Sequence, residues 1–410
     1  MINLTKLWTG VAQPADGLRY GHGVGGHATE ARSRRPITVW NITRTCNLRC
    51  VHCYSDSNAV QYPGELTWEQ MEQVVEDLAA YQVPSLLFSG GEPMIHPRFF
   101  DLVDKATAAG LKLTISTNGT LITPEKAALL KAANVAYVGI SLDGIGPIHD
   151  EFRRKEGAFD AAVRGFKHCH AVGQKTGLRL TLARHNVENI EKILDFIEDQ
   201  EIQRVCFYHL VPAGRGCELQ VLAPHEARGA IDTLIARVEA WHQQGVQREL
   251  LTVTQPADGA YLLVRMQNEN HPNLAEARSL LGWNGGGANS SGRGIANIDT
   301  QGNVHPDQFW QDVGLGNVKQ TLFSQIWEGH NPESADVLAA IRSIGLLTGP
   351  QRQARMSGPC AACNWFPICG GGFRTRAAFA NDGDLWGSDP GCYLRADERL
   401  APVTPEGGCL

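Results

Sequence analysis

The chain has 410 residues, of which 43% are hydrophobic and 20% are charged, and its formal net charge is −6. These values are ordinary for a globular protein and give no sign of a basic surface for nucleic acid or for an anionic membrane. No apolar run is long enough to span a membrane and no secretory signal is seen, so we expect a cytoplasmic protein without membrane insertion.

The 11 cysteines are too sparse for a disulfide scaffold and too clustered for chance. Three lie within residues 46–53 and three within residues 360–369. In a cytoplasmic protein, such clusters indicate metal sites. Three other cysteines fit no cluster spacing and are expected to be structural: Cys169, Cys206 and Cys217.

Residues 1–35 are expected to form an irregular N-terminal arm. The segment 21–27 is rich in glycine, and an arginine-rich stretch follows it up to Pro36. We expect the arm to be loosely draped over the protein. The alternative is a lid whose histidines or arginines touch an anionic ligand.

Strand-like and helix-like segments alternate from residue 37 to residue 241. The apolar patterns predict strands at 37–42, 85–89, 111–117, 135–142, 178–182 and 204–210. They predict helices at 66–81, 97–109, 124–133, 159–172, 187–198 and 224–241, the first of which has a capping pattern at Thr67 and Gln70. Six β/α units with nearly continuous apolar strands predict an α/β fold, a partial (β/α)6 barrel of the TIM type, over residues 36–244.

The first predicted strand leads directly into a loop with the spacing C-x3-C-x2-C, at Cys46, Cys50 and Cys53. Thiolates are the usual ligands of [4Fe–4S] clusters, and three of them leave one of the four irons open to a small molecule. From these residues alone, the alternative is a structural zinc site that is completed by His52 or Cys206.

Glycine-rich or polar motifs follow the next three strands. They are G-G-E-P at 90–93, S-T-N-G at 116–119 and S-L-D-G at 141–144. In parallel barrels the active site lies at the carboxyl ends of the strands, so we expect these motifs to face the cysteine loop. The two glycines allow a backbone to approach a ligand closely, and Glu92 can hold an ammonium group. On its own, G-G-E-P is equally compatible with a simple turn.

The cysteine loop together with these motifs resembles the radical S-adenosylmethionine (radical SAM) superfamily over residues 36–240. The resemblance implies that Cys46, Cys50 and Cys53 are the catalytic cluster ligands, and that S-adenosylmethionine chelates the open iron of their [4Fe–4S] cluster. It also implies the contacts of the cofactor: Gly90, Gly91 and Glu92 around its amino group, Asn118 and Ser141 near its ribose, and Arg153 at its carboxylate. The reaction would generate a 5′-deoxyadenosyl radical that abstracts hydrogen from a substrate.

The pattern changes after residue 244. We expect a linker or helical connection at 245–274, a smaller domain at 275–400 and a tail at 401–410. The C-terminal cysteines resemble a truncated SPASM/twitch extension of the superfamily, in which Phe373 and Ser290-Ser291 stand where further cysteines would be expected. The resemblance implies one closed auxiliary [4Fe–4S] cluster held by four thiolates: Cys360, Cys363, Cys369 and Cys392. A structural zinc site is the alternative.

Residues 39–46, 303–310 and 369–374 resemble the branch of this superfamily that modifies tetrapyrroles, and most of all its haem d1 biosynthesis enzymes. The branch implies 12,18-didecarboxysiroheme, an iron tetrapyrrole, as substrate and the removal of two propionate side chains. An electron donor such as flavodoxin or ferredoxin is also implied. The alternatives are an enzyme of the siroheme-dependent haem pathway, which decarboxylates acetates or forms vinyls, a peptide-modifying SPASM enzyme, and a non-catalytic scaffold.

Such a substrate needs a ligand for its iron and partners for its carboxylates. His209, at the end of the sixth predicted strand, is the first candidate for the iron, and the weaker candidates are His22, His27 and His305. For each histidine, a structural role in a loop or core is the alternative. Arg215 and Arg293 each lie beside glycines and could bind carboxylates bidentately, or they could be solvated surface residues.

Overall fold

The computed structural model describes residues 1–13, 16–20, 35–283, 291–344, 347 and 349–401. Its strands are β1 (Ile2–Asn3), β2 (Ile37–Thr43), β3 (Leu86–Gly90), β4 (Leu113–Thr117), β5 (Tyr137–Ser141), β6 (Thr176–Leu182), β7 (Arg204–His209), β8 (Glu249–Val253), β9 (Ile295–Ile298), β10 (Asn303–His305) and β11 (Gly316–Asn317). Its helices in the first half of the chain are α1 (Leu4–Thr9), α2 (Asp16–Tyr20), α3 (Trp68–Ala80), α4 (Phe99–Ala108), α5 (Pro124–Ala132), α6 (Pro147–Arg153), α7 (Ala158–Ala171) and α8 (Ile190–Asp199). Those in the second half are α9 (Pro224–Gln243), α10 (Ala257–Asn268), α11 (Leu274–Trp283), α12 (Phe323–Trp327), α13 (Pro332–Ile344), α14 (Gly349–Arg355), α15 (Phe366–Cys369), α16 (Arg374–Ala380) and α17 (Ala396–Leu400).

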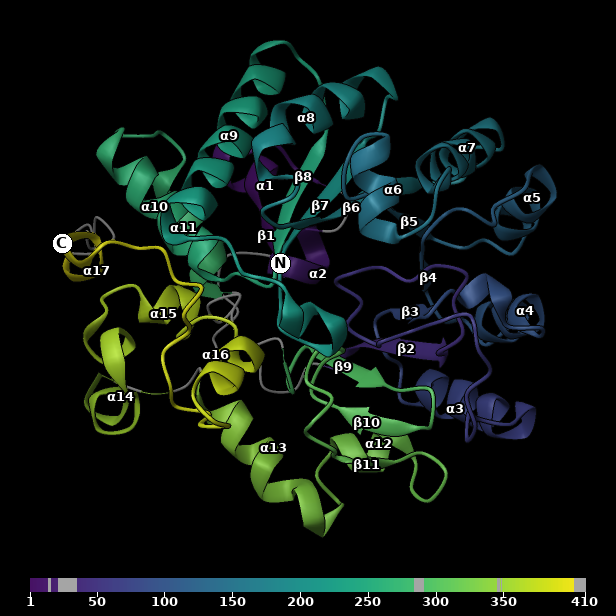
Figure 1. The fold of residues 1–410 in the computed structure, drawn as a ribbon. Helices are drawn as coiled ribbons and strands as arrows, with labels where there is room; N and C mark the ends of the chain where they lie inside the picture. The colour runs from purple at the N-terminus through teal and green to yellow at the C-terminus, as the bar shows by residue number, and fades with distance from the viewer. Residues whose placement is uncertain (14–15, 21–34, 284–290, 345–346, 348, 402–410) are drawn as a thin grey trace.

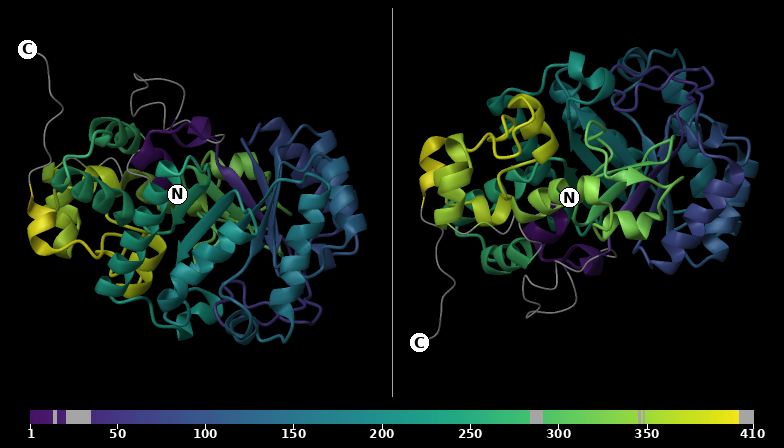
Figure 2. Two further views of the ribbon diagram at one scale, coloured as in Figure 1. Left: turned by 90° about the horizontal axis from the view of Figure 1, so that it is seen from above. Right: turned by 90° about the horizontal axis from the view of Figure 1, so that it is seen from below.

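One sheet organises the described residues, with the strand order β1-β8-β7-β6-β5-β4-β3-β2-β9-β10-β11. From β2 to β8 each strand is parallel to the next, and β9 is parallel to β2. The strands at the two ends are antiparallel to their neighbours. In the part of the chain that the structure describes, the sheet does not close on itself, and helices cover its outer side (Figures 1 and 2). The predicted α/β partial barrel is confirmed.

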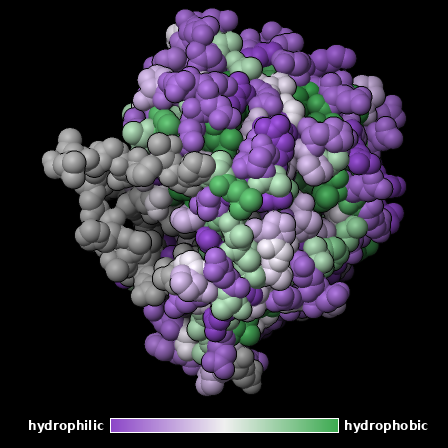
Figure 3. Space-filling view, turned by 90° about the vertical axis from the view of Figure 1, so that its left-hand side faces the viewer, coloured by the Kyte–Doolittle hydropathy of each residue, from purple (hydrophilic) through white to green (hydrophobic). Residues whose placement is uncertain are grey.

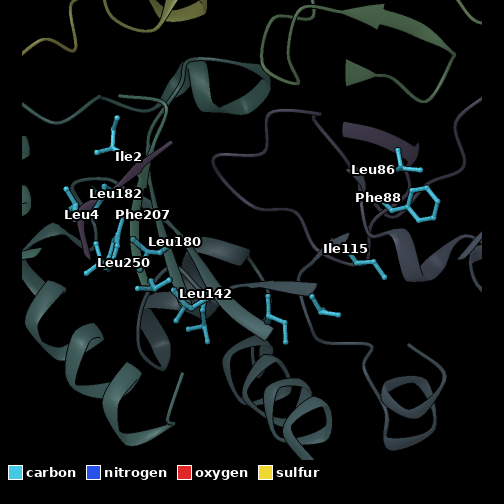
Figure 4. Packing of buried hydrophobic residues seen from close by; sticks show 14 of the residues in the cluster. Ile2, Leu4, Leu86, Phe88, Ile115, Leu142, Leu180, Leu182, Phe207 and Leu250 are labelled. Carbon is cyan, nitrogen blue, oxygen red and sulfur yellow. The ribbon is translucent and has the colours of Figure 1, made fainter. Parts of the chain in front are cut away.

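Local sequence explains the helices well. Thr67 and Gln70 form the predicted capping box of α3, whose inward face buries Val75 and Leu78 completely. Pro124 begins α5, and Gly110 follows α4 with a φ of +80°. Buried side chains from successive strands, such as Phe88, Ile115 and Leu180, fill the space around the sheet (Figure 4). Each such side chain stabilises the fold by roughly 1.5–3 kcal/mol through its burial.

The sheet contains a further parallel strand, β8, that the sequence patterns did not predict. This strand begins with a buried carboxylate, Glu249, which accepts hydrogen bonds from Arg19 at 2.7 Å and from Asn3 at 3.1 Å. Arg204 forms an ion pair with the same side chain at 3.2 Å. A charged strand residue is tolerated here because partners that are remote in sequence neutralise it.

The prediction of an irregular N-terminal arm is wrong for residues 2–9 and 16–20. β1 pairs with β8, with Ile2 opposite Thr252. α1 buries Leu4, Leu7 and Trp8, and Figure 4 shows Leu4 close to Leu250. The N-terminal segment therefore completes one end of the sheet. Residues 21–34 lie outside the described residues, and so do the predictions made for them.

The C-terminal helices α14 to α17 lie on the side of the barrel where α10 and α11 lie (Figures 1 and 2). β9 lies beside β2, so the sheet continues from the predicted barrel into the predicted second domain. A buried ion pair, Arg376 with Asp389 at 2.7 Å, ties α16 to the following loop. Figure 3 shows polar and apolar side chains interspersed on this face. None of the described helices is both long enough and apolar enough to cross a membrane.

Candidate active site

The cysteine loop follows β2 and is anchored by backbone hydrogen bonds. The Cys46 N–H bonds to the Asn58 carbonyl at 2.9 Å, and the Val51 N–H bonds to the Phe152 carbonyl of α6 at 3.0 Å. Cys46 and Cys50 are buried and Cys53 is half-buried. Burial raises the pKa of the Cys46 thiol to about 12 and raises that of Cys50 as well. Thiols with such a raised pKa lose their protons only when a strong positive charge lies next to the sulfur. Iron supplies such a charge.

The two glycines at the end of β3 lie directly against the strand segment that enters the cysteine loop. The Gly91 N–H bonds to the Thr43 carbonyl at 2.7 Å. A Cβ atom on Gly91 would lie 2.3 Å from the Thr45 carbonyl oxygen, and one on Gly90 would lie 2.2 Å from the Thr43 carbonyl oxygen. Any side chain at these two positions would therefore push the G-G-E-P turn away from the cysteine loop.

Glu92 is fully buried, and both of its carboxylate oxygens accept hydrogen bonds from neighbouring segments. Its donors are the Thr117 hydroxyl at 2.8 Å, the Asn118 N–H at 2.8 Å and the Met94 N–H at 3.2 Å. Burial raises the pKa of Glu92, and these hydrogen bonds oppose that shift. In the structure, Glu92 joins the loops after β3 and β4, a role that sequence reasoning did not foresee.

Asn118, Ser141 and Arg153 lie around the same strand ends. The Asn118 side-chain N–H bonds to the Asn47 side-chain oxygen at 2.9 Å, beside Cys46. Arg153 Nη1 lies 3.3 Å from Cys50 Sγ, and Nη2 pairs with the Asp143 carboxylate. Arg153 Nε is buried and has no hydrogen-bond partner among the described residues. Although burial alone would raise it, the Arg153 guanidinium holds the pKa of Asp143 below its usual value.

An inner cavity of about 110 Å³ lies at the carboxyl ends of the strands. Six of its polar and aromatic lining residues are His52, Tyr54, Ser141, Arg153, Arg179 and His209. An outer cleft of about 920 Å³ lies at the barrel mouth, the end of the barrel where the parallel strands have their carboxyl ends. It is lined there by residues between 41 and 63 and between 212 and 217, and on its other side by residues between 299 and 385. Tyr54 and Phe309 line both spaces, with their rings edge to face at 5.3 Å. This aromatic pair lies where the inner cavity adjoins the larger cleft.

The two described histidines that were candidates for substrate iron differ in their hydrogen bonding. His209 lines the inner cavity and uses Nε2 to bond to Asp258 at 3.1 Å. His305 uses both ring nitrogens, Nδ1 with the Val313 carbonyl at 2.9 Å and Nε2 with Asp299 at 3.3 Å. This favours the structural alternative for His305. His22 and His27 lie outside the described residues.

Arg215 and Arg293, the predicted carboxylate partners, lie in different surroundings. Arg215 bonds to the Cys50 carbonyl at 2.9 Å, to Asp56 at 2.5 Å and to the Ser57 carbonyl at 2.9 Å. Arg215 thus clamps the cysteine loop. Arg293 is half-buried in the turn before β9.

The four C-terminal cysteines lie close together. Cys360, Cys363 and Cys369 are buried and Cys392 is half-buried. Burial raises the pKa of Cys369, and the other three thiols add to this shift because they lie within electrostatic range. Within the described ranges, no three His, Cys, Asp or Glu side chains surround a point that a single metal ion would fill. The same holds for the three cysteines at the barrel mouth.

The positions where further cysteines were expected carry a hydrogen-bonded network instead. The Ser291 hydroxyl donates to Asp307 at 2.5 Å, and the Thr375 hydroxyl donates to the same carboxylate at 3.0 Å. Asp307 also accepts the Phe309 N–H at 2.7 Å. Phe373 packs edge to face against Phe309 at 6.1 Å. This network fixes the aromatic side chain that stands between the cavity and the cleft.

Comparison with known proteins agrees with this geometry. The model of the radical SAM superfamily matches residues 40–197. Fe-coproporphyrin III synthase of Methanosarcina barkeri is 41% identical over 404 residues, which cover 97% of this chain and 98% of that protein. The chain belongs to the radical SAM superfamily. Pre-heme d1 synthase of Dinoroseobacter shibae is 40% identical over 382 residues, covering 91% of this chain and 90% of that protein.

Solved structures of radical SAM enzymes share the fold. SuiB of Streptococcus suis bound to S-adenosylmethionine superposes with a TM-score of 0.67 over 88% of this chain and 78% of that chain, at 16% identity. anSMEcpe with bound AdoMet gives a TM-score of 0.66 over 89% of this chain and 96% of that chain, at 19% identity. The predicted family membership is thus confirmed, and it implies a [4Fe–4S] cluster and S-adenosylmethionine as cofactors of this radical SAM enzyme.

The residues at the barrel mouth fit these cofactors. The loop offers three thiols, which is the ligand set of a cluster with one open iron. The unpartnered Nε of Arg153 is a buried donor beside Cys50, so an anionic group such as the carboxylate of S-adenosylmethionine would satisfy it. When bound, the cluster supplies the electron that cleaves the cofactor and yields a 5′-deoxyadenosyl radical.

Sequence reasoning missed Arg179, which lines the inner cavity of this radical SAM enzyme. Its guanidinium donates to the Tyr208 hydroxyl, and no carboxylate among the described residues forms an ion pair with it. A clue was present, because Arg179 is a charged residue between two leucines of a buried strand. A cation in this position suits a substrate that carries carboxylates.

Replacing Arg215 by lysine is expected to weaken retention of the cluster at Cys46, Cys50 and Cys53. The three bonds of Arg215 to the loop leave from three separate guanidinium nitrogens, and the single nitrogen of a lysine cannot reach all three acceptors. Iron content after gel filtration should fall, whereas circular dichroism should show an unchanged fold. Arg184→Lys, at an exposed arginine that pairs with Glu226 at 3.4 Å, is the control. Iron content in Arg215→Lys equal to that of the control would contradict the clamping role.

Proposed function

We propose that this radical SAM enzyme removes carboxylate-bearing side chains from an iron tetrapyrrole, 12,18-didecarboxysiroheme. The observation that carries the proposal is that the two relatives of about 40% identity, which align over nearly their whole lengths, are both named as tetrapyrrole synthases. A cleft of about 920 Å³ at the barrel mouth supports a macrocyclic substrate. The aromatic pair Tyr54 and Phe309 offers surfaces for its flat faces.

One candidate reaction is the predicted removal of two propionate side chains. Its support is the similarity to pre-heme d1 synthase. The guanidinium of Arg179, which donates to the Tyr208 hydroxyl, would hold a side-chain carboxylate that reaches from the cleft into the inner cavity. The aromatic pair would exclude water from the carbon that loses hydrogen.

The second candidate is the removal of two whole acetate side chains, as two two-carbon units, which would yield an iron coproporphyrin. Its support is the similarity to Fe-coproporphyrin III synthase, whose alignment leaves only 3% of this chain unmatched. The unmatched 3% is fewer than 20 residues. The alignment therefore includes at least part of residues 1–20, which form β1, α1 and α2. The greater coverage makes acetate removal the better supported of the two reactions.

We also propose that Cys360, Cys363, Cys369 and Cys392 hold a second, closed [4Fe–4S] cluster. Its support is the grouping of four buried or half-buried thiols. The C-x2-C-x5-C spacing of three of them and the separate Cys392 supply four thiolates, enough to close a cubic cluster completely.

Anaerobic turnover with 12,18-didecarboxysiroheme, S-adenosylmethionine and a reductant is expected to give a product of lower mass together with 5′-deoxyadenosine. Loss of two two-carbon units would identify acetate removal, and loss of two three-carbon chains would identify propionate removal. Mass spectrometry of the extracted tetrapyrrole is the measurement.

The control for this assay omits S-adenosylmethionine, and a parallel reaction contains a peptide in place of the tetrapyrrole. Formation of 5′-deoxyadenosine that responds to the peptide and not to the tetrapyrrole would contradict the proposal. It would favour a peptide-modifying enzyme.

A further inference from the structure

Three buried side chains connect the inner cavity to the loop of the C-terminal cysteines. His209, at the end of β7, bonds through Nε2 to Asp258 of α10 at 3.1 Å. The other oxygen of Asp258 accepts the Tyr393 hydroxyl at 2.7 Å. The exposed fractions are 7% for His209, 0% for Asp258 and 3% for Tyr393. Tyr393 directly follows Cys392 in the chain.

The hydrogen bonds determine where the imidazole proton lies. A carboxylate only accepts, and the Tyr393 hydroxyl already donates to one oxygen of Asp258. His209 therefore donates its Nε2–H to the other oxygen, and its Nδ1 keeps a free lone pair. Nδ1 has no hydrogen-bond partner among the described residues, and His209 lines the inner cavity. Histidines that bind metals show the same arrangement, with the second ring nitrogen donating to a carboxylate.

We propose that Asp258 and Tyr393 position His209 so that its Nδ1 binds the iron of the tetrapyrrole substrate. The inference rests on the proposed function, because it needs an iron tetrapyrrole that reaches from the cleft past Tyr54 and Phe309 to the inner cavity lined by His209. The inference adds two positioning residues to that function, and it names the ring nitrogen that contacts the iron. His305 cannot serve in the same way without breaking a hydrogen bond, since both of its ring nitrogens are engaged.

The arrangement also makes the iron ligand depend on the fold of the cysteine-bearing loop. Asp258 lies 49 residues from His209 and 135 residues from Tyr393 in sequence, so the orientation of His209 is set by tertiary contacts. Removing the Tyr393 hydroxyl would leave one oxygen of a fully buried carboxylate without its partner. Asp258 would then be free to rotate, and its hold on His209 would weaken.

The test measures anaerobic binding of 12,18-didecarboxysiroheme to the full-length protein by absorption and electron paramagnetic resonance. His209→Ala is expected to change the ligand-field bands of the bound iron, and added imidazole should restore them. Asp258→Asn should weaken binding by about 10- to 100-fold, the range for changes beside a metal ligand. Tyr393→Phe should act in the same direction with a smaller effect.

A matched control is Tyr261→Phe. The Tyr261 ring lies 5.4 Å from the Tyr393 ring, but its hydroxyl donates to Asp232 at 2.5 Å and not to Asp258. This variant should keep the wild-type spectrum. Circular dichroism and iron content of every variant check that the fold and the clusters are retained.

The outcomes separate the inference from the function on which it rests. If the wild-type protein does not bind the tetrapyrrole, the proposed function fails. If it binds, and His209→Ala and Asp258→Asn leave spectrum and affinity unchanged, the positioning role is overturned while the function stands. Because Asp258→Asn and Tyr393→Phe each alter a single polar group, the proposal stays testable even if His209→Ala does not fold.

Discussion

Replacing Cys50 by alanine is expected to abolish formation of 5′-deoxyadenosine, the largest effect of any single substitution. The side chain is buried in the loop after β2, with Arg153 Nη1 at 3.3 Å from its sulfur. Loss of one of three thiols leaves too few ligands for the cluster, and Arg153 loses an anionic neighbour. Iron and sulfide should fall from about eight to about four atoms of each per chain. Anaerobic iron and sulfide analysis, with chromatography of the nucleoside product, measures both effects.

Two further variants make this result specific. Cys217→Ala alters an exposed cysteine that fits neither cluster and should leave iron content unchanged. Cys392→Ala should also reduce iron to about four atoms, but it should spare the cluster at the barrel mouth. Nucleoside formation that persists in Cys50→Ala would contradict the ligand assignment. A wild-type iron content of about four would contradict the second cluster.

The features that sequence reasoning predicted are those carried by neighbouring residues. The spacing of Cys46, Cys50 and Cys53, and the motifs at the ends of β3, β4 and β5, follow from local chemistry and from the geometry of parallel strands. The helix caps are local as well. Such signals need no knowledge of the tertiary structure.

The features that it missed depend on remote contacts. β8 begins with Glu249, a residue that disfavours a buried strand until Arg19 and Arg204 neutralise it from other elements. The hydrogen bond from the Asn118 N–H to Glu92 spans 26 residues, so the motif alone did not reveal it. His209 was predicted from its place at a strand end, but its partner Asp258 has no sequence signal.

Replacing Gly91 by alanine is expected to damage both stability and cofactor cleavage. The added Cβ would lie 2.3 Å from the Thr45 carbonyl oxygen and 2.5 Å from the Arg44 carbonyl oxygen, and neither backbone atom can move without shifting the cysteine loop. The φ of Gly91 is not in the left-handed region, so the effect is a steric clash alone. Overpacking of this kind costs about 1–3 kcal/mol of folding free energy.

The matched control for Gly91→Ala is Gly229→Ala, at an exposed position within α9 where a new Cβ meets no atom within 4 Å. An alanine inside a helix should stabilise the protein by roughly 0.5–1 kcal/mol, because the unfolded chain loses conformational freedom. Thermal melting and 5′-deoxyadenosine formation measure the two variants. Gly91→Ala should lower both, since displacing the turn also moves the loop that holds the open iron. A Gly91→Ala protein with wild-type melting and activity would show that the turn can leave the cysteine loop without consequence, and that its role is not one of close packing.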